Sequence, residues 1–223
     1  MTAVVFAVVM LAGLFINGFT FITLFVIICL GCSFETIKIT RLIKPNNWHK
    51  FLPLALLYAF LPIILMIDLG FNLSFLPFIT RGKNLVPYSF ILPVAVVLSI
   101  WINDTMAYIV GSMIGKTPFS KISPKKTWEG TIGGAILCVL VMGLIGLYLP
   151  VSQGLELKHW VAIATVAAVA GTLGDLFESK LKRMANIKDS GTFMPGHGGF
   201  LDRFDSLLFT APLVWLYMKL FVL

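Results

Sequence analysis

The feature that most constrains this fold is a repeated pattern of long apolar runs. Runs of roughly 20 residues with few charges recur along the chain, and a helix needs about this length to cross the hydrocarbon core of a bilayer. Charged residues make up 12% of the 223 residues, against about 25% in soluble domains. The runs are continuous rather than alternating, which excludes a membrane β-barrel. We therefore expect an all-α fold, a polytopic transmembrane helix bundle.

Turn residues and charges divide the apolar runs into about seven expected spans. The first run, residues 2–37, is too long for one span, and Asn17-Gly18 near its middle is typical of a turn. We therefore expect a hairpin there, with a short first helix. No Lys or Arg precedes Lys38, so no cleavable signal peptide is expected. The expected spans are residues 2–16, 19–37, 51–69, 88–115, 127–149, 158–184 and 203–222, with an interfacial loop at 70–87.

Basic residues gather in three of the connections between spans. Residues 38–50, 116–126 and 180–203 hold four, four and five of the seventeen Lys and Arg residues. With the spans placed as above, all three segments fall on one side, which the positive-inside rule assigns to the cytoplasm. We expect a multi-pass protein of the inner (cytoplasmic) membrane whose polar site faces the cytoplasm. That these charges only orient the chain is the alternative, which we favour for residues 38–50.

The polar stretch at residues 179–205 lies between two long apolar runs and holds five basic and three acidic residues. Just before and within it, Asp175, Glu178, Ser179 and Lys182 stand at i, i+3, i+4 and i+7, so one helix face carries all four. Charge within a span is costly and usually faces a partner or a wet cavity. A Glu178–Lys182 salt bridge would explain those two residues but not Asp175, which we expect to be functional.

Two aspartates, Asp202 and Asp205, stand at i and i+3 where the last span opens. One alone would be explained as a helix cap, because the helix dipole favours a carboxylate there. Two of them, with Arg203 between and a glycine-rich turn before, look more like oxygen ligands for Mg²⁺. This ion is typically held by one or two carboxylates together with phosphates and water. We expect Asp175 to meet Asp202 at such a site, at the cytoplasmic ends of their helices.

The glycine-rich turn at residues 195–199 is a candidate phosphate site. Gly198 and Gly199 can present backbone N–H groups to an anion, because glycine lets the backbone approach closely. A flexible turn explains the same glycines equally well. His197, in the middle of the turn, stands too isolated to be named as a general base.

A second candidate anion site lies in the loop before the fifth span. Ser123 is expected to cap a helix there, with Pro124 at its first position. Lys125 and Lys126 would then face the positive end of the helix dipole, and a bound phosphate would resolve that conflict. The alternative is that these lysines are surface residues attracted to anionic lipid.

The fourth span carries two polar residues inside its apolar run, Asn103 and Asp104. We expect both to face an internal polar cavity, although an interhelical hydrogen bond without a catalytic role is the alternative. Ala107, Gly111 and Gly115 form a small-residue stripe that suits close helix packing. Together these groups predict a site for polyanionic substrates, one of them a lipid, with a divalent metal. Phosphoryl or nucleotidyl transfer fits such a site, because that chemistry is mostly positioning and charge neutralisation.

Four blocks of polar and small residues follow one another between about residues 100 and 205. They are Asn103-Asp104-Thr105-x-Ala107-Tyr108; Lys116 to Gly130 with Glu129; Gly174-Asp175 with Glu178-Ser179; and Ser179-x-x-Lys182-Arg183 followed by Lys188-Asp189, Pro195 to Gly199 and Asp202-Arg203-x-Asp205. In this order the blocks are highly specific, and they resemble the phosphatidate cytidylyltransferase family, also called CDP-diacylglycerol synthases.

The resemblance implies that CTP and phosphatidic acid react to give CDP-diacylglycerol and pyrophosphate with Mg²⁺. Residues 1–99 would supply N-terminal transmembrane helices, and residues 100–223 the catalytic ones. The implied catalytic residues are Asp104, Asp175, Lys182, Arg183, Asp202 and Asp205, with Asp175, Asp202 and Asp205 at the metal. The implied substrate-binding residues are Asn103, Ser123, Lys125, Lys126, Ser179, Lys188, Asp189, His197, Gly198, Gly199 and Arg203. The implied partners are the bilayer and a second copy of the chain; no nucleic acid is expected.

Two other functions share some of these features. A CTP-dependent kinase of a membrane lipid alcohol would also use basic loops and metal-binding carboxylates, but it would transfer a phosphoryl group. A transporter for an anionic solute would show matched half-repeats and helices broken near the midplane. The sequence contains no such repeat, and its charge gathers toward one membrane face.

Overall fold

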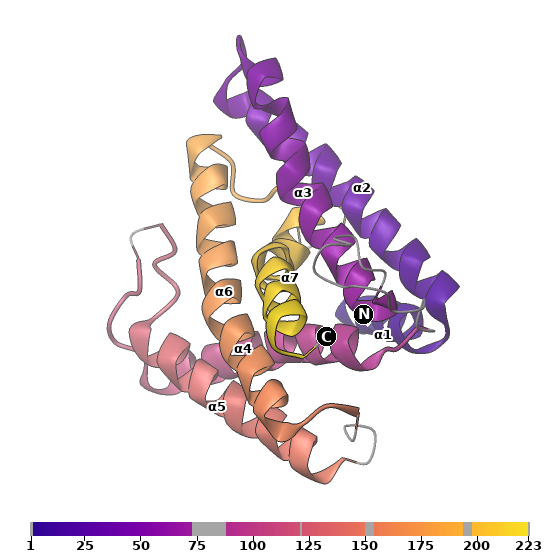
Figure 1. Cartoon of the computed structure of the whole chain (residues 1–223). Helices are drawn as coiled ribbons and strands as arrows, with labels where there is room; N and C mark the ends of the chain where they lie inside the picture. The colour runs from indigo at the N-terminus through magenta and orange to yellow at the C-terminus, as the bar shows by residue number, and fades with distance from the viewer. Residues whose placement is uncertain (1, 73–87, 121, 150–153, 194–197, 223) are drawn as a thin grey trace.

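The fold is seen in a computed structural model that describes all residues except 1, 73–87, 121, 150–153, 194–197 and 223 (Figure 1). The described chain is helical and contains no strand, although Pro118 and Thr127 form an isolated bridge. The all-α prediction is therefore confirmed. The helices are α1 (Thr2–Phe15), α2 (Gly18–Ile43), α3 (Trp48–Phe71), α4 (Ile91–Ile114), α5 (Trp128–Tyr148), α6 (Leu157–Met184) and α7 (Leu201–Phe221).

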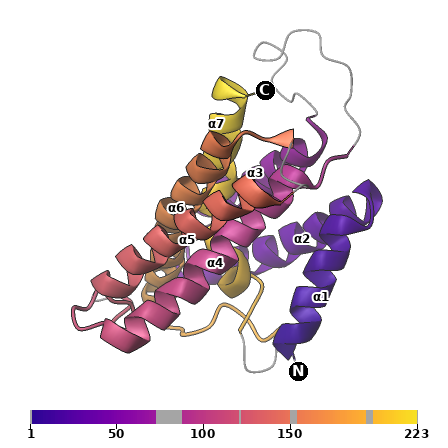
Figure 2. The same cartoon turned by 90° about the horizontal axis from the view of Figure 1, so that it is seen from below.

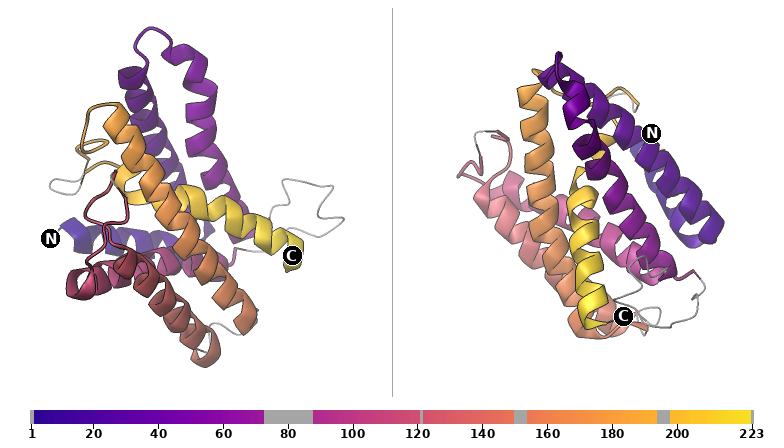
Figure 3. Two further views of the ribbon diagram at one scale, coloured as in Figure 1. Left: turned by 90° about the vertical axis from the view of Figure 1, so that its left-hand side faces the viewer. Right: turned by 45° about the horizontal axis from the view of Figure 1, so that its top comes forward.

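Six helices within the described ranges, α2 to α7, are long and apolar enough to cross a membrane. With 14 residues, α1 is about 21 Å long, which is less than the roughly 30 Å of a bilayer core. In the left view of Figure 3, α1 turns sharply away from α2. The first of the seven expected spans is thus a helix, but one shorter than a bilayer core. The predicted transmembrane bundle is otherwise confirmed.

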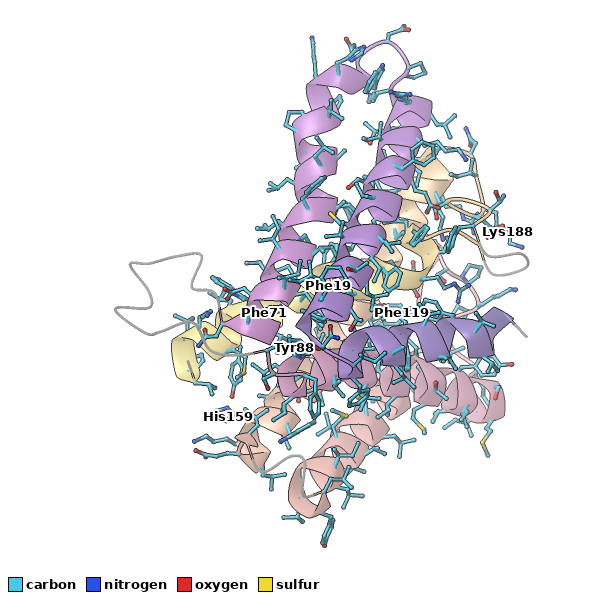
Figure 4. The ribbon with its side chains drawn as sticks, turned by 90° about the vertical axis from the view of Figure 1, so that its right-hand side faces the viewer. Phe19, Phe71, Tyr88, Phe119, His159 and Lys188 are labelled. Atoms are coloured by element: carbon cyan, nitrogen blue, oxygen red, sulfur yellow. The ribbon has the colours of Figure 1, made fainter. Side chains whose placement is uncertain are left out.

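The turn between α1 and α2 forms at the predicted dipeptide. The Asn17 side chain accepts a hydrogen bond from the Thr20 backbone N–H at 2.9 Å and so caps α2. Gly18 is required here, because a Cβ would lie 2.6 Å from the ring of Phe71. Figure 4 shows Phe71 and Tyr88 beside this corner.

The first basic segment, predicted as a connection over residues 38–50, is mostly helical in the structure. α2 continues to Ile43, so Lys38 and Arg41 are helical and the connection to α3 covers only residues 44–47. Pro45 explains the end of the helix, because the residue before a proline is forced out of the α region. Lys44 accordingly adopts φ −133° and ψ 68°.

The three basic segments remain on one side of the bundle. The α2–α3, α4–α5 and α6–α7 connections are separated from one another by two helices each, so this result does not depend on whether α1 crosses the membrane. Figure 2 shows the α4–α5 and α6–α7 connections at one end, and the α5–α6 connection and the C-terminus at the opposite end. The fold therefore agrees with the one-sided distribution of charge predicted from the sequence.

Helices α4 and α5 pack through small residues at backbone distance. A Cβ on Gly134 would lie 2.6 Å from the backbone nitrogen of Ala107, and one on Gly130 would lie 2.8 Å from the Cα of Gly111. The small-residue stripe predicted on α4 is confirmed at Ala107 and Gly111. This close contact fixes the position of the α4–α5 connection, which carries the lysine pair.

Helices α6 and α7 approach each other in the same way. A Cβ on Gly174 would lie 2.5 Å from the carbonyl oxygen of Asp205. The Ser206 hydroxyl donates to the carbonyl oxygen of Gly171 at 3.1 Å. The contact therefore sets the distance between Asp175, which follows Gly174, and Asp205.

We expect Gly174→Ala to lower the midpoint of thermal denaturation, because the added methyl group must push the α7 backbone away. Overpacking of this kind costs about 1–3 kcal/mol. Gly143→Ala in α5 is the matched control, since its Cβ would meet only Val161, at 3.7 Å. Denaturation of both purified variants in detergent measures the difference, and equal midpoints would contradict the contact.

A buried ion pair joins α3 to α7 near their C-terminal ends. The Asp68 carboxylate pairs with Lys219 Nζ at 3.0 Å and accepts a hydrogen bond from the Trp215 indole at 2.6 Å. Asp68 is 0% exposed and Lys219 6%. Asp68 stands one residue before the end of the expected span 51–69, and the sequence did not predict its partner. The pair fixes α7 at the end opposite the basic connections.

Candidate active site

A cavity of about 400 Å³ opens between α4, the α4–α5 connection, α5 and α6. Its lining includes the polar residues Asn103, Asp104, Lys125, Lys126, Thr127 and Asp175. Three separate sequence blocks therefore meet at one cavity. The expectation that Asn103 and Asp104 face a polar cavity is confirmed.

An ion pair crosses this cavity from the α4–α5 connection to α6. Lys126 Nζ contacts the Asp175 carboxylate directly, and both side chains remain 29% exposed. The Ser179 hydroxyl donates to Asp175 Oδ1 at 3.2 Å, as expected for residues on one helix face. Asp175 is thus oriented by two neighbours and is still open to the cavity.

Asn103 brings an unsatisfied oxygen to the same place. Its Nδ2 donates to Asp104 Oδ1 at 3.4 Å, while its Oδ1 is buried and has no hydrogen-bond partner. A buried acceptor without a partner costs about 1–3 kcal/mol. That oxygen would therefore be stabilised by a hydrogen-bond donor or a cation that reaches it.

The connection that carries the lysines is held by Glu129 near the start of α5. Its carboxylate accepts the backbone N–H groups of Lys116 at 3.2 Å and Thr117 at 3.1 Å, and the Thr117 hydroxyl at 2.8 Å. Phe119 N–H also donates to the Lys126 carbonyl at 2.7 Å. In the sequence, Glu129 was named only as part of a block that resembles the family. In the structure, it holds the lysine-bearing connection against the start of α5.

The predicted helix cap at Ser123 is wrong. The Ser123 carbonyl accepts Lys126 N–H at 3.1 Å in a turn, and the cap of α5 is Thr127, whose hydroxyl accepts Gly130 N–H at 3.1 Å. Pairing between the two arms of the loop holds Thr127 extended, with ψ 153°. Lys125 and Lys126 consequently lie before the helix rather than in its first turn, although both still line the cavity.

A second charged cluster lies where α6 approaches the start of α7. Lys182 Nζ is 2.5 Å from Glu178 and 2.6 Å from Asp202, and these three side chains are largely buried. The predicted Glu178–Lys182 pair is therefore confirmed. The second oxygen of Asp202 accepts Gly199 N–H at 2.7 Å and both the N–H, at 2.9 Å, and the hydroxyl of Ser190.

The three aspartates predicted at the metal are thus distributed between two clusters. Asp175 pairs with Lys126, whereas Asp202 pairs with Lys182. Asp205 lies within electrostatic range of Asp175 and of Asp104 across the helix contact. Among the described residues, no group of three or more His, Cys, Asp or Glu side chains is arranged to hold an ion. A metal role for Asp202 stays a prediction.

The remaining candidates lie around the α6–α7 connection. The side chains of Arg183, Lys188, Asp189 and Arg203 are exposed, and Figure 4 shows Lys188 at the outer edge of the molecule. His197 lies outside the described residues. Their predicted contacts with substrate stay predictions.

Two glycines of the predicted phosphate turn have a clear structural use. Gly198 adopts φ +84°, which favours glycine, and a Cβ there would lie 2.5 Å from the Asp202 carboxylate. Gly199 donates its N–H to that carboxylate. The turn therefore presents the Gly199 N–H to Asp202 rather than to an external anion.

One buried carboxylate was missed by the sequence reasoning. Glu35 on α2 accepts hydrogen bonds from Ser190, Phe200 and Leu201 in the α6–α7 connection and the start of α7. A charge within the apolar run 2–37 was a usable signal, because such charges usually face a partner. The partner itself lies more than 150 positions away in the sequence.

Comparison with known proteins gives a consistent result. A model described as the cytidylyltransferase family matches residues 49–221. The chain is 46% identical over 117 residues to phosphatidate cytidylyltransferase 4, chloroplastic, of Arabidopsis thaliana. The aligned segment covers 52% of this chain and 29% of that protein. The chain is 41% identical over 134 residues to the phosphatidate cytidylyltransferase of Staphylococcus haemolyticus, covering 60% of this chain and 48% of that protein.

The matched segment of a further relative, the phosphatidate cytidylyltransferase of Staphylococcus aureus strain COL, is 136 residues at 40% identity and covers 49% of that protein. The chain thus spans about half the length of the bacterial relatives and less of the plant one. The family model nevertheless covers most of the chain, including both charged clusters. On this evidence the chain belongs to the cytidylyltransferase family.

Proposed function

We propose that this protein transfers a cytidylyl group from CTP to phosphatidic acid, producing CDP-diacylglycerol and pyrophosphate. One observation carries the proposal: within the family match, a single cavity brings together the Lys125–Lys126 pair and the Asp175 carboxylate at the basic end of the bundle. The cations suit a triphosphate, and the setting in a helix bundle gives a lipid substrate access from the membrane. The names of the matched relatives agree with this chemistry.

In the proposed reaction a phosphate oxygen of the lipid attacks the α-phosphorus of CTP in line. The new P–O bond forms as the bond from the α-phosphorus to the bridging oxygen breaks, and pyrophosphate leaves with the electron pair. The protein contributes positioning and charge neutralisation. Lys125 and Lys126 bind the triphosphate, and Asp175 holds Lys126 over the cavity until the substrate arrives.

We propose Mg²⁺ as the cofactor. The donor set fits, because Mg²⁺ needs only one or two carboxylates in addition to phosphate and water oxygens. Asp175 and Asp205 are the proposed ligands, and Asp104 and the unpartnered oxygen of Asn103 are proposed to bind its water shell. When bound, the ion supplies positive charge to the phosphates of the nucleotide. Asp202 would first have to exchange its bonds to Lys182 and Ser190.

Orientation and assembly complete the proposal. The three basic connections favour a cavity that faces the cytoplasm from the inner membrane. A homodimer is proposed from the family resemblance.

Removal of divalent metal is expected to abolish transfer, because the lysines that line the cavity in the described part of the chain have a lower charge density than Mg²⁺. Activity of the purified protein should fall to background in excess EDTA and return when Mg²⁺ is added beyond the chelator. Full activity in EDTA would contradict a metal-dependent site.

The function is tested with protein purified in detergent, phosphatidic acid, Mg²⁺ and CTP labelled at either the α- or the γ-phosphate. Cytidylyl transfer predicts label in the lipid from the α position only. Label from the γ position would make the protein a lipid kinase. Lack of incorporation from either position, together with anion uptake by reconstituted liposomes, would support transport.

A further inference from the structure

The start of α7 is capped by a carboxylate from another helix. Phe200, the residue at the N-cap, makes no side-chain capping bond of its own. Instead, Glu35 on α2 accepts Phe200 N–H on Oε1 at 3.0 Å and Leu201 N–H on Oε2 at 2.8 Å. The first N–H groups of a helix lack partners within the helix and attract negative charge. Glu35, which is 5% exposed, therefore supplies from another helix the hydrogen-bond acceptors that the first turn of α7 lacks.

The surrounding residues are shaped to admit this carboxylate. A Cβ on Gly191 would lie 2.2 Å from a Glu35 oxygen, and one on Gly199 would lie 2.3 Å from both. One turn before Glu35, Gly31 leaves space for the ring of Phe200, which a Cβ would approach to 2.4 Å. Two glycines thus leave space for the Glu35 carboxylate, and a third leaves space for the Phe200 ring that packs against α2.

A chain of polar contacts connects Glu35 to the charged cluster on α6. The Ser190 hydroxyl lies 2.6 Å from Glu35 Oε2 and 2.8 Å from Asp202 Oδ2. Asp202 in turn holds Lys182 at 2.6 Å. The contacts therefore run from α2 through the α6–α7 connection to α7 and α6. A displacement at Glu35 would be transmitted to the helix that carries Asp205.

We propose that Glu35 is a positioning residue for the active site: it fixes the first turn of α7, and with it the placement of Asp202 and Asp205. The inference rests on the proposed function, because it assigns Glu35 a part in that reaction. Glu35 lies outside residues 49–221, which the family model matches. The N-terminal helices accordingly contribute to the site as well as to membrane insertion.

Glu35→Gln tests the charge at nearly constant shape. The amide has only one oxygen, so its NH₂ group must face either Phe200 N–H or the Leu201 and Ser190 donors. Glu35→Asp keeps the carboxylate but shortens its reach, and should restore part of the activity. Two matched controls are Ser33→Ala, a buried polar change on the same helix, and Asp68→Asn, which removes an equally buried carboxylate from the opposite end.

We expect Glu35→Gln to reduce kcat about 100-fold, the effect of a displacement of roughly 1 Å at a reacting centre. KM for CTP should change much less, because Lys125 and Lys126 belong to a different connection. Glu35→Asp should recover at least part of kcat. Ser33→Ala and Asp68→Asn should keep wild-type kcat, although Asp68→Asn should denature at a lower temperature.

A second readout does not depend on activity. Trypsin cleavage after the exposed Lys188 should be faster in Glu35→Gln than in wild type, and unchanged in Asp68→Asn. If wild type does not transfer the α-label, the proposed function fails, while the cleavage result still decides whether Glu35 holds the loop. If wild type is active and Glu35→Gln keeps its kcat, the positioning role is wrong. It is also wrong if Asp68→Asn, at the same decrease in denaturation temperature, loses as much kcat as Glu35→Gln.

Discussion

Replacing Asp175 with asparagine is expected to reduce kcat for cytidylyl transfer about 1,000-fold, as for loss of a preorganised charge at a reacting centre. Asparagine has the same shape and can still accept the Ser179 hydroxyl, so the fold should survive. It cannot pair with Lys126 as a carboxylate does, nor bind Mg²⁺ with comparable strength. Initial rates with α-labelled CTP, together with thermal denaturation, measure the two effects separately.

Glu156→Gln is the control for this substitution. Glu156 is an exposed carboxylate whose partner is Lys158, at 2.7 Å, and it lies in the α5–α6 connection away from the basic end. Its removal should leave kcat unchanged. Near-normal turnover by a folded Asp175→Asn protein would remove Asp175 from the active site.

Replacing Lys182 with methionine is expected to cause the largest loss of stability. Lys182 is the cation between two largely buried carboxylates, Glu178 and Asp202. Removing one partner from a buried ion pair costs about 3–5 kcal/mol. For a chain of this length that corresponds to a decrease of about 10 °C in the denaturation midpoint.

The double variant Lys182→Met with Glu178→Gln should recover part of this loss, because it removes one of the two stranded charges. Lys180→Met is the matched control, since Lys180 lies on the same helix but is exposed. Equal midpoints for Lys180→Met and Lys182→Met would show that the cluster is not electrostatically coupled.

Hydropathy predicted most of this fold because the membrane imposes a strong local constraint. Each span must satisfy its own backbone hydrogen bonds, so its length and apolar character are visible in the sequence. The turn at Asn17 and the small-residue face at Ala107 and Gly111 were likewise local signals. Asp104, Lys126 and Asp175 could be assigned to one site because charges within a span or at a helix start usually face a partner or a ligand.

Pairing between distant residues could not be predicted in the same way. Glu35 forms hydrogen bonds with Ser190 and Phe200, and Asp68 pairs with Lys219. These residues lie too far apart in the sequence for a periodic pattern to predict their contacts. The error at Ser123 has a similar origin. Ser123-Pro124 is a sound local signal for a helix start, but pairing between the two arms of the loop delays the helix until after Thr127.

The packing of α7 has a consequence for how the protein is made. Of the six helices of spanning length, α7 is the least apolar and the most enclosed by its neighbours. It carries Asp202 and Asp205 near one end and Lys219 near the other. Each charge opposes entry into lipid, by about 2.5–3.5 kcal/mol at the helix centre and by less toward the helix ends. The partners of Lys219 and Asp202 are Asp68 on α3 and Lys182 on α6, and both belong to helices that leave the ribosome earlier. We therefore expect α7 to enter the membrane more readily when α3 and α6 are already present to pair with its charges.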